Sequence, residues 1–128
     1  MEGTNPENWD WPDSLDALVA APGCHSLVFE NDGVRVLDTR IDPGETTPLH
    51  THRWPGILYM LSTDHFVRRD DAGALLVDTR ASGTLPEPGT TVPTDALPPH
   101  TLENVGTSQI RLINIELKHR SVGAATGA

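Results

Sequence analysis

Short apolar runs separated by turn residues make up most of the chain from Ser26 onward. Val34–Ile41 is predicted to be an alternating strand, with Val34, Val36 and Asp38 on one face and Arg35, Leu37 and Thr39 on the other. Many short strands at such a spacing indicate an all-β sandwich or barrel. By the same signals, further strands are predicted over Ser26–Glu30, Ile57–Leu61, His65–Arg69, Ala74–Thr79, near Thr90–Val92, and over Thr101–Asn104 and Gln109–Leu117.

The residues between these runs predict turns, a hairpin and a loop. Asp42-Pro43-Gly44 predicts a tight turn, because proline presets φ and glycine accepts a positive φ. Ile57–Leu61 and His65–Arg69 are expected to pair as a hairpin around the short turn between them. Residues 45–52 are expected to lead into a strand that is broken at Pro55-Gly56, and residues 80–99, rich in proline and glycine, to be mostly loop.

One segment has helical spacing. Pro12 can begin a helix, Leu15, Leu18 and Val19 share one of its faces, and Pro22-Gly23 ends it. The chain is therefore divided into an N-terminal segment with a short helix (residues 1–25), a β-barrel (26–120) and a disordered tail (121–128).

The composition narrows the class of protein. Eighteen acidic residues against nine basic ones give a net charge of −9, which disfavours nucleic acid as a partner. Cys24 is the single cysteine, so an intrachain disulfide is excluded and a reducing compartment is favoured. The acidic first residues do not resemble a signal peptide, and no apolar stretch approaches the roughly 18 residues of a membrane helix. A soluble cytoplasmic protein without a membrane partner is expected.

Two of the six histidines, His50 and His52, form an H-x-H pair. Residues i and i+2 of a strand point to the same side, so both imidazoles can reach one metal ion. Imidazole is the commonest metal ligand in proteins and binds in its neutral form. The pair alone is a weak signal, because such a spacing also arises by chance.

The surrounding residues strengthen this interpretation. Gly44, five residues and then His50-Thr51-His52 match the opening of a G-x5-H-x-H motif, and His100 followed by Asn104 matches the end of a second motif, H-x3-N. With these two half-motifs, residues 34–117 resemble the cupin superfamily. The resemblance implies a jelly-roll (double-stranded β-helix) barrel that holds one divalent metal ion through His50, His52 and His100.

The chain departs from that pattern at the place of a further metal ligand. The glutamate that usually follows the H-x-H pair is replaced by Gly56 or Ile57, and Leu97 stands where the second motif usually has glycine. Gly56 has the strand parity of His50 and His52, so it is predicted to face the ion. On that basis Gly56→Glu should tighten metal binding and weaken the binding of anionic ligands.

A small-molecule pocket is expected beside the ion. Trp54 shares the parity of the two ligands, and Trp54, Gly56, Met60 and Leu102 are assigned to the pocket, although plain barrel core is an alternative for Trp54 and Met60. His25, His65 and His119 fit neither motif and are interpreted as surface or core residues.

Three functions stay open for such a site. The resemblance is close to three-histidine cupins, which include non-haem iron dioxygenases, and three neutral ligands leave the charge of the ion uncompensated. A dioxygenase of a small, anionic, chelating substrate is therefore the first hypothesis. Fe(II) is the favoured metal, with Zn, Ni, Mn and Cu as alternatives. A metal-assisted isomerase or hydrolase, and a non-enzymatic cupin that binds or senses a small ligand, are the other two.

A homodimer is also expected. A barrel this small has edge strands, and exposed edges must be covered or paired. Ser26–Glu30, together with Trp9 and Trp11, is the candidate segment to cross between subunits, in part because small members of the resembled family commonly dimerise.

Overall fold

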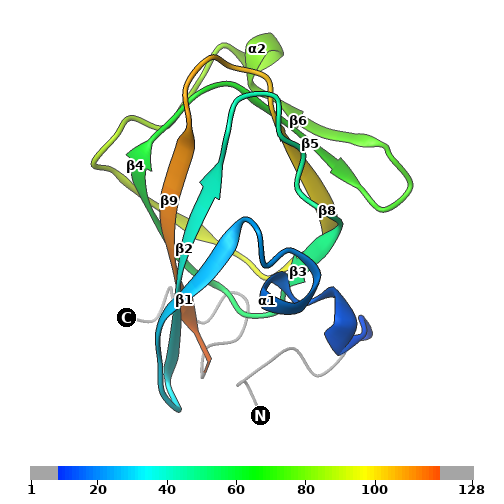
Figure 1. Ribbon diagram of the computed structural model, residues 1–128, viewed down its shortest axis with the longest axis vertical. Coiled ribbons are helices and arrows are strands. Elements are labelled where there is room, and N and C mark those ends of the chain that lie inside the picture. The colour runs from blue at the N-terminus through cyan, green and yellow to red at the C-terminus, as the bar shows by residue number, and fades with distance from the viewer. Residues whose placement is uncertain (1–8, 119–128) are drawn as a thin grey trace.

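The computed structural model describes residues 9–118, which form two antiparallel sheets that face each other across a barrel (Figure 1). The first sheet has the strand order β1 (His25–Glu30), β2 (Val34–Ile41), β9 (Ile110–Leu117), β4 (Gly56–Ser62) and β7 (Thr91–Thr94). The second has the order β3 (His50–His52), β8 (Leu97–Asn104), β5 (Phe66–Asp70) and β6 (Leu75–Asp78). The predicted all-β class is confirmed.

Two long central strands, β2 and β9, form the middle of the first sheet. They pair without a register shift from Val34 opposite Leu117 to Ile41 opposite Ile110. Every second residue of β9 from Ile110 onward is buried, and Leu37 and Ile41 of β2 are buried on the same inner face. Because strand side chains alternate between faces, this register gathers the buried side chains of both strands on one face. That face is mixed, since it also carries the buried polar residues Arg35, Thr39, Asn114 and Glu116.

The apolar core lies inside one part of the barrel. Ile41, Met60, Ile110 and Leu112 form a buried cluster, against which the partly buried Phe66 and other apolar side chains pack. Met60, assigned to the ligand pocket from the sequence, belongs to this core and is not among the residues that line the cavity described below.

The predicted hairpin between β4 and β5 is wrong. β4 pairs with β7 and β9, whereas β5 pairs with β6 and β8, so the chain crosses from one sheet to the other between them. Asp64, in this crossing, accepts hydrogen bonds from the backbone N–H groups of Thr107 (2.8 Å) and Ser108 (2.9 Å). Adjacent apolar runs indicate strands, but which edges they join depends on backbone groups far away in the chain.

The remaining differences lie around β8 and the short helices. β8 begins at Leu97, earlier than predicted, and its pairing shifts register between His50 opposite His100 and His52 opposite Leu97. Proline is tolerated in a strand at such an irregularity, which explains why the proline-rich segment could join the sheet. The helical region is a 3-10 turn (η1, Asp13–Leu15) and α1 (Ala17–Ala20), and α2 (Thr79–Ser82) was not predicted.

Helix α1 lies beside β3 (Figure 1), and Asp16, at its N-terminus, bridges to Thr51. This contact holds the H-x-H strand between the helix and β8. In residues 9–118 we find no helix of the length and apolar character needed to cross a membrane. The predicted disordered tail, 121–128, and His119 lie outside the described residues.

Candidate metal centre

Four buried histidines from three strands meet inside the barrel: His50 and His52 on β3, His100 on β8 and His25 on β1. The ring centroids of His50 and His52 are 5.1 Å apart, and that of His100 lies 4.4 Å from His50 and 5.8 Å from His52. The three residues predicted from the sequence are therefore brought together by the register of β3 and β8.

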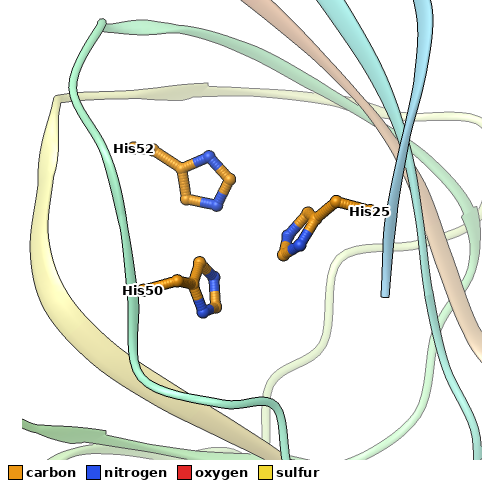
Figure 2. Close-up of side chains that lie close together, drawn as sticks. All are labelled: His25, His50 and His52. Carbon is orange, nitrogen blue, oxygen red and sulfur yellow. The ribbon is translucent and has the colours of Figure 1, made fainter. Parts of the chain in front are cut away.

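His25 is the member of the cluster that sequence reasoning missed. Its ring centroid lies 4.8 Å from that of His50 and 5.2 Å from that of His52, and Figure 2 shows its ring facing theirs from the opposite side of the cluster. One ring nitrogen from each of His25, His50 and His52 lies within 4.8 Å of the others, which suits a shared metal ion. From the sequence, His25 is interpreted as a surface or core residue. The structure places it in the cluster, because its position depends on the pairing of β1 with β2.

The hydrogen bonds of the four rings suit metal binding. Nδ1 of His25 lies 3.0 Å from the carbonyl oxygen of Ala21, and Nδ1 of His50 and of His100 lie 2.8 Å from the carbonyl oxygens two residues earlier. Nδ1 of His52 lies 2.8 Å from a carboxylate oxygen of Glu116. Carbonyl oxygens only accept, so Nδ1 carries the proton and Nε2 keeps its lone pair free for a metal ion.

Burial keeps these imidazoles neutral. Burial in the barrel, followed by repulsion from the rings of His52 and His50, lowers the pKa of His25 to about 3. Burial and the neighbouring His52 lower the pKa of His50 to about 4, and burial together with His50 lowers that of His100 to about 2. Near neutral pH these three side chains are thus in the form that binds metals. The described residues therefore contain a candidate site for a divalent metal ion.

A buried ion-pair network supports His52. Glu116 accepts from His52 through one carboxylate oxygen and from Nε of Arg35 (2.7 Å) through the other. The guanidinium of Arg35 also donates to both carboxylate oxygens of Asp16, at 3.0 and 2.9 Å, and lies over the ring of Trp54. Two carboxylates against one guanidinium leave a net charge of −1 beside the histidines. The charge of a bound ion would therefore be partly compensated, although no carboxylate of this network belongs to the cluster of ring nitrogens.

Gly56 does not offer a place for the missing glutamate. Gly56 lines the cavity, but a Cβ there would overlap the carbonyl oxygen of Ile115 and lie 3.0 Å from its carbon and 3.1 Å from Cα of Glu116. The prediction that Gly56→Glu tightens metal binding assumed free space at this position, and the structure contradicts that premise. The parity argument failed because β3 ends at His52 and β4 begins, in the other sheet, at Gly56.

Gly56→Ala is expected to destabilise the protein by about 1–3 kcal/mol or more, because the added methyl group meets the backbone of β9, which cannot move without breaking sheet pairing. Urea unfolding of the metal-free protein measures the change. Gly23→Ala is the matched control, because a Cβ at Gly23 meets nothing within 4 Å. Equal stability of the two variants would contradict the close approach of β4 and β9.

A cavity of about 80 Å³ opens beside the four histidines. A single bound water needs roughly 10–15 Å³ of such a cavity, so this space suits a small ligand. Three of the predicted pocket residues line it, namely Trp54, Gly56 and Leu102. The lining also includes Leu97 and Arg68.

Other residues that the sequence singled out lie in structural positions. Asn104 is fully buried and its amide donates to the carbonyl oxygens of Ile41 and Ser108, both at 2.9 Å. Nδ1 of His65 lies 3.0 Å from the hydroxyl of Thr79, and His65 is not among the residues that line the cavity. Burial raises the pKa of the Cys24 thiol to about 11, which makes it a poor nucleophile.

Comparison with known proteins identifies the architecture. No model of a protein family matches the chain, and no curated protein matches its sequence. Among solved structures, a cupin domain from Bordetella pertussis is similar with a TM-score of 0.60 and 18% identity, over 73% of this chain and 91% of that one. An RmlC-like cupin family protein with a double-stranded β-helix fold, from Methanocaldococcus jannaschii, is similar with a TM-score of 0.52 and 10% identity, over 93% of both chains. The chain described here has the cupin fold.

Proposed function

We propose that this protein is a metal-dependent oxygenase that acts on a small, chelating, anionic substrate. The observation that carries the proposal is the histidine cluster, whose free Nε2 atoms share a small cavity. His25, His50 and His52 would hold the ion, and His100 lies beside them. An Fe(II) ion bound there would supply coordination positions for a chelating substrate together with redox chemistry toward O2.

The surrounding residues support binding and positioning rather than acid–base catalysis. Glu116 is the carboxylate among the residues that line the cavity, and both of its oxygens are engaged, by His52 and by Arg35. A hydrolase or isomerase usually needs a free general base within reach of its substrate. Apolar side chains such as Leu97 and Leu102 limit the access of water, which strengthens electrostatic interactions inside the cavity.

Oxygen consumption tests this proposal. Metal-free protein is loaded anaerobically with Fe(II), and O2 uptake is followed with β-diketones, thiols and aromatic diols as candidate substrates. We expect substrate-dependent uptake by the Fe(II) form and none by the Zn(II) form or by Fe(II)-treated His50→Ala. A protein that binds Fe(II) but consumes no O2 with any of these classes would contradict the oxygenase and leave the isomerase, hydrolase and ligand-binding functions.

We also propose that the protein is a homodimer. β1 is an edge strand of its sheet, and Leu27, Val28 and Phe29 on it are 49%, 59% and 52% exposed. An edge strand with apolar residues exposed on both faces is an association site, and a second copy of the same strand complements it. Light scattering is expected to give the mass of a dimer at micromolar concentration, and Val28→Asp to shift it toward a monomer. A monomeric wild-type protein would refute the dimer.

The cytoplasmic location stays a prediction of the sequence.

A further inference from the structure

Arg68 differs from the other cationic side chains that the structure describes. Each of the others, six arginines and Lys118, forms an ion pair with an aspartate or glutamate. Arg68 has no ion pair and no side-chain hydrogen bond within residues 9–118, although it is half-buried. Its neighbour Arg69, by contrast, lies 3.4 Å from Glu103.

The sheet register places Arg68 at the histidine cluster. Arg68 of β5 is paired with Leu102 of β8, and Leu102 lies two residues after His100, so these side chains share a face of the sheet. All three residues line the cavity.

An arginine without a partner in such a place has an energetic cost. Burial alone lowers the pKa of Arg68, because no nearby carboxylate offsets the loss of water. Its guanidinium nonetheless keeps its charge and presents several N–H donors, in a geometry that matches a carboxylate. An anionic group of a ligand in the cavity would offset this cost.

We propose that Arg68 binds the carboxylate of the ligand while a second anionic group of the same ligand reaches the metal ion. This inference rests on the proposed metal site and narrows the substrate class of the proposed function. The ligand would be a short dianionic compound, such as a carboxylic acid with a second carboxylate, an ionised hydroxyl or a thiolate. The small volume of the cavity, about 80 Å³, favours a short compound.

Binding of defined probes to the Co(II)-substituted protein tests the inference without requiring turnover. Malonate and succinate are titrated as two-ended ligands, and azide as a probe of the metal alone, with the visible spectrum of Co(II) as the readout. In Arg68→Gln we expect the affinity for the better dicarboxylate to fall by about 10- to 100-fold, the range for a hydrogen bond between charged groups. The affinity for azide, which binds the ion alone, should fall by much less than the affinity for the dicarboxylate.

Arg69→Gln is the matched control, because Arg69 is adjacent and pairs with Glu103 instead of lining the cavity. It should bind dicarboxylates as the wild type does. Two results in Arg68→Gln would overturn the inference: unchanged dicarboxylate affinity, or a loss of azide affinity equal to the loss of dicarboxylate affinity. It would also be overturned if the wild-type protein took up no Co(II), or if it bound neither malonate nor succinate. If the dicarboxylate result holds but the Fe(II) protein consumes no O2, the oxygenase fails and the role of Arg68 stands.

Discussion

Replacement of His50 or His52 by alanine is expected to remove most of the divalent metal that the wild-type protein binds. Each variant deletes one of three ring nitrogens that lie within 4.8 Å of one another. The affinity should fall by more than the roughly 10- to 100-fold that the loss of an outer-shell partner costs. Elemental analysis of protein made without a histidine tag gives the stoichiometry, which should be about one ion per chain for the wild type.

Parallel variants of His25 and His100 test whether each of these two rings belongs to the ligand set. His25→Ala is expected to lower occupancy as His50→Ala does, contrary to what the sequence motifs alone indicated. His100→Ala is expected to lower it too, and full occupancy there would remove His100 from the ligand set. His65→Ala is the control, since His65 does not line the cavity. Full metal occupancy in His50→Ala would disprove the site.

Glu116→Ala is expected to lower the free energy of unfolding by about 3–5 kcal/mol, the usual cost of removing one partner of a buried ion pair. Glu116 and Arg35 have side chains that are 5% and 6% exposed, so water cannot replace the lost carboxylate. Arg35 would then form an ion pair with Asp16 only, and His52 would lose the acceptor that orients its ring. Because a domain is stable by only about 5–15 kcal/mol, this is a large part of the total.

Urea unfolding of the metal-free variants measures this loss. Glu103→Ala is a matched control, because the pair of Glu103 with Arg69 is exposed and should contribute no more than about 1 kcal/mol. Glu116→Gln keeps the shape of the side chain and separates the effect of charge from that of packing. A Glu116→Ala protein as stable as Glu103→Ala would show that the network does not hold the barrel together.

Local signals in the sequence were sufficient for much of the fold. The predicted strand Val34–Ile41 has the bounds of β2, and Ser26–Glu30 and Gln109–Leu117 differ from β1 and β9 by one residue. The alternation of apolar and polar residues and the chemistry of turns act over a few residues, so they can be interpreted without knowing the partner strands. The partner strands of β4 and of β5 could not be predicted in this way, because they depend on backbone groups distant in the chain.

The residues of the candidate site also fall into two groups, those that the sequence indicated and those that only the structure brought to the site. The H-x-H pair and His100 were recognisable, because spacing along a strand decides which side chains share a face. His25, Glu116 and Arg68 reach the cavity only through the pairing of β1, β9 and β5 with their neighbours. Glu116, for example, is 64 residues from the histidine that it orients. The sequence by itself determined the strands and the core of a metal site; the tertiary structure decided the remaining groups around it, because long-range register brings them together.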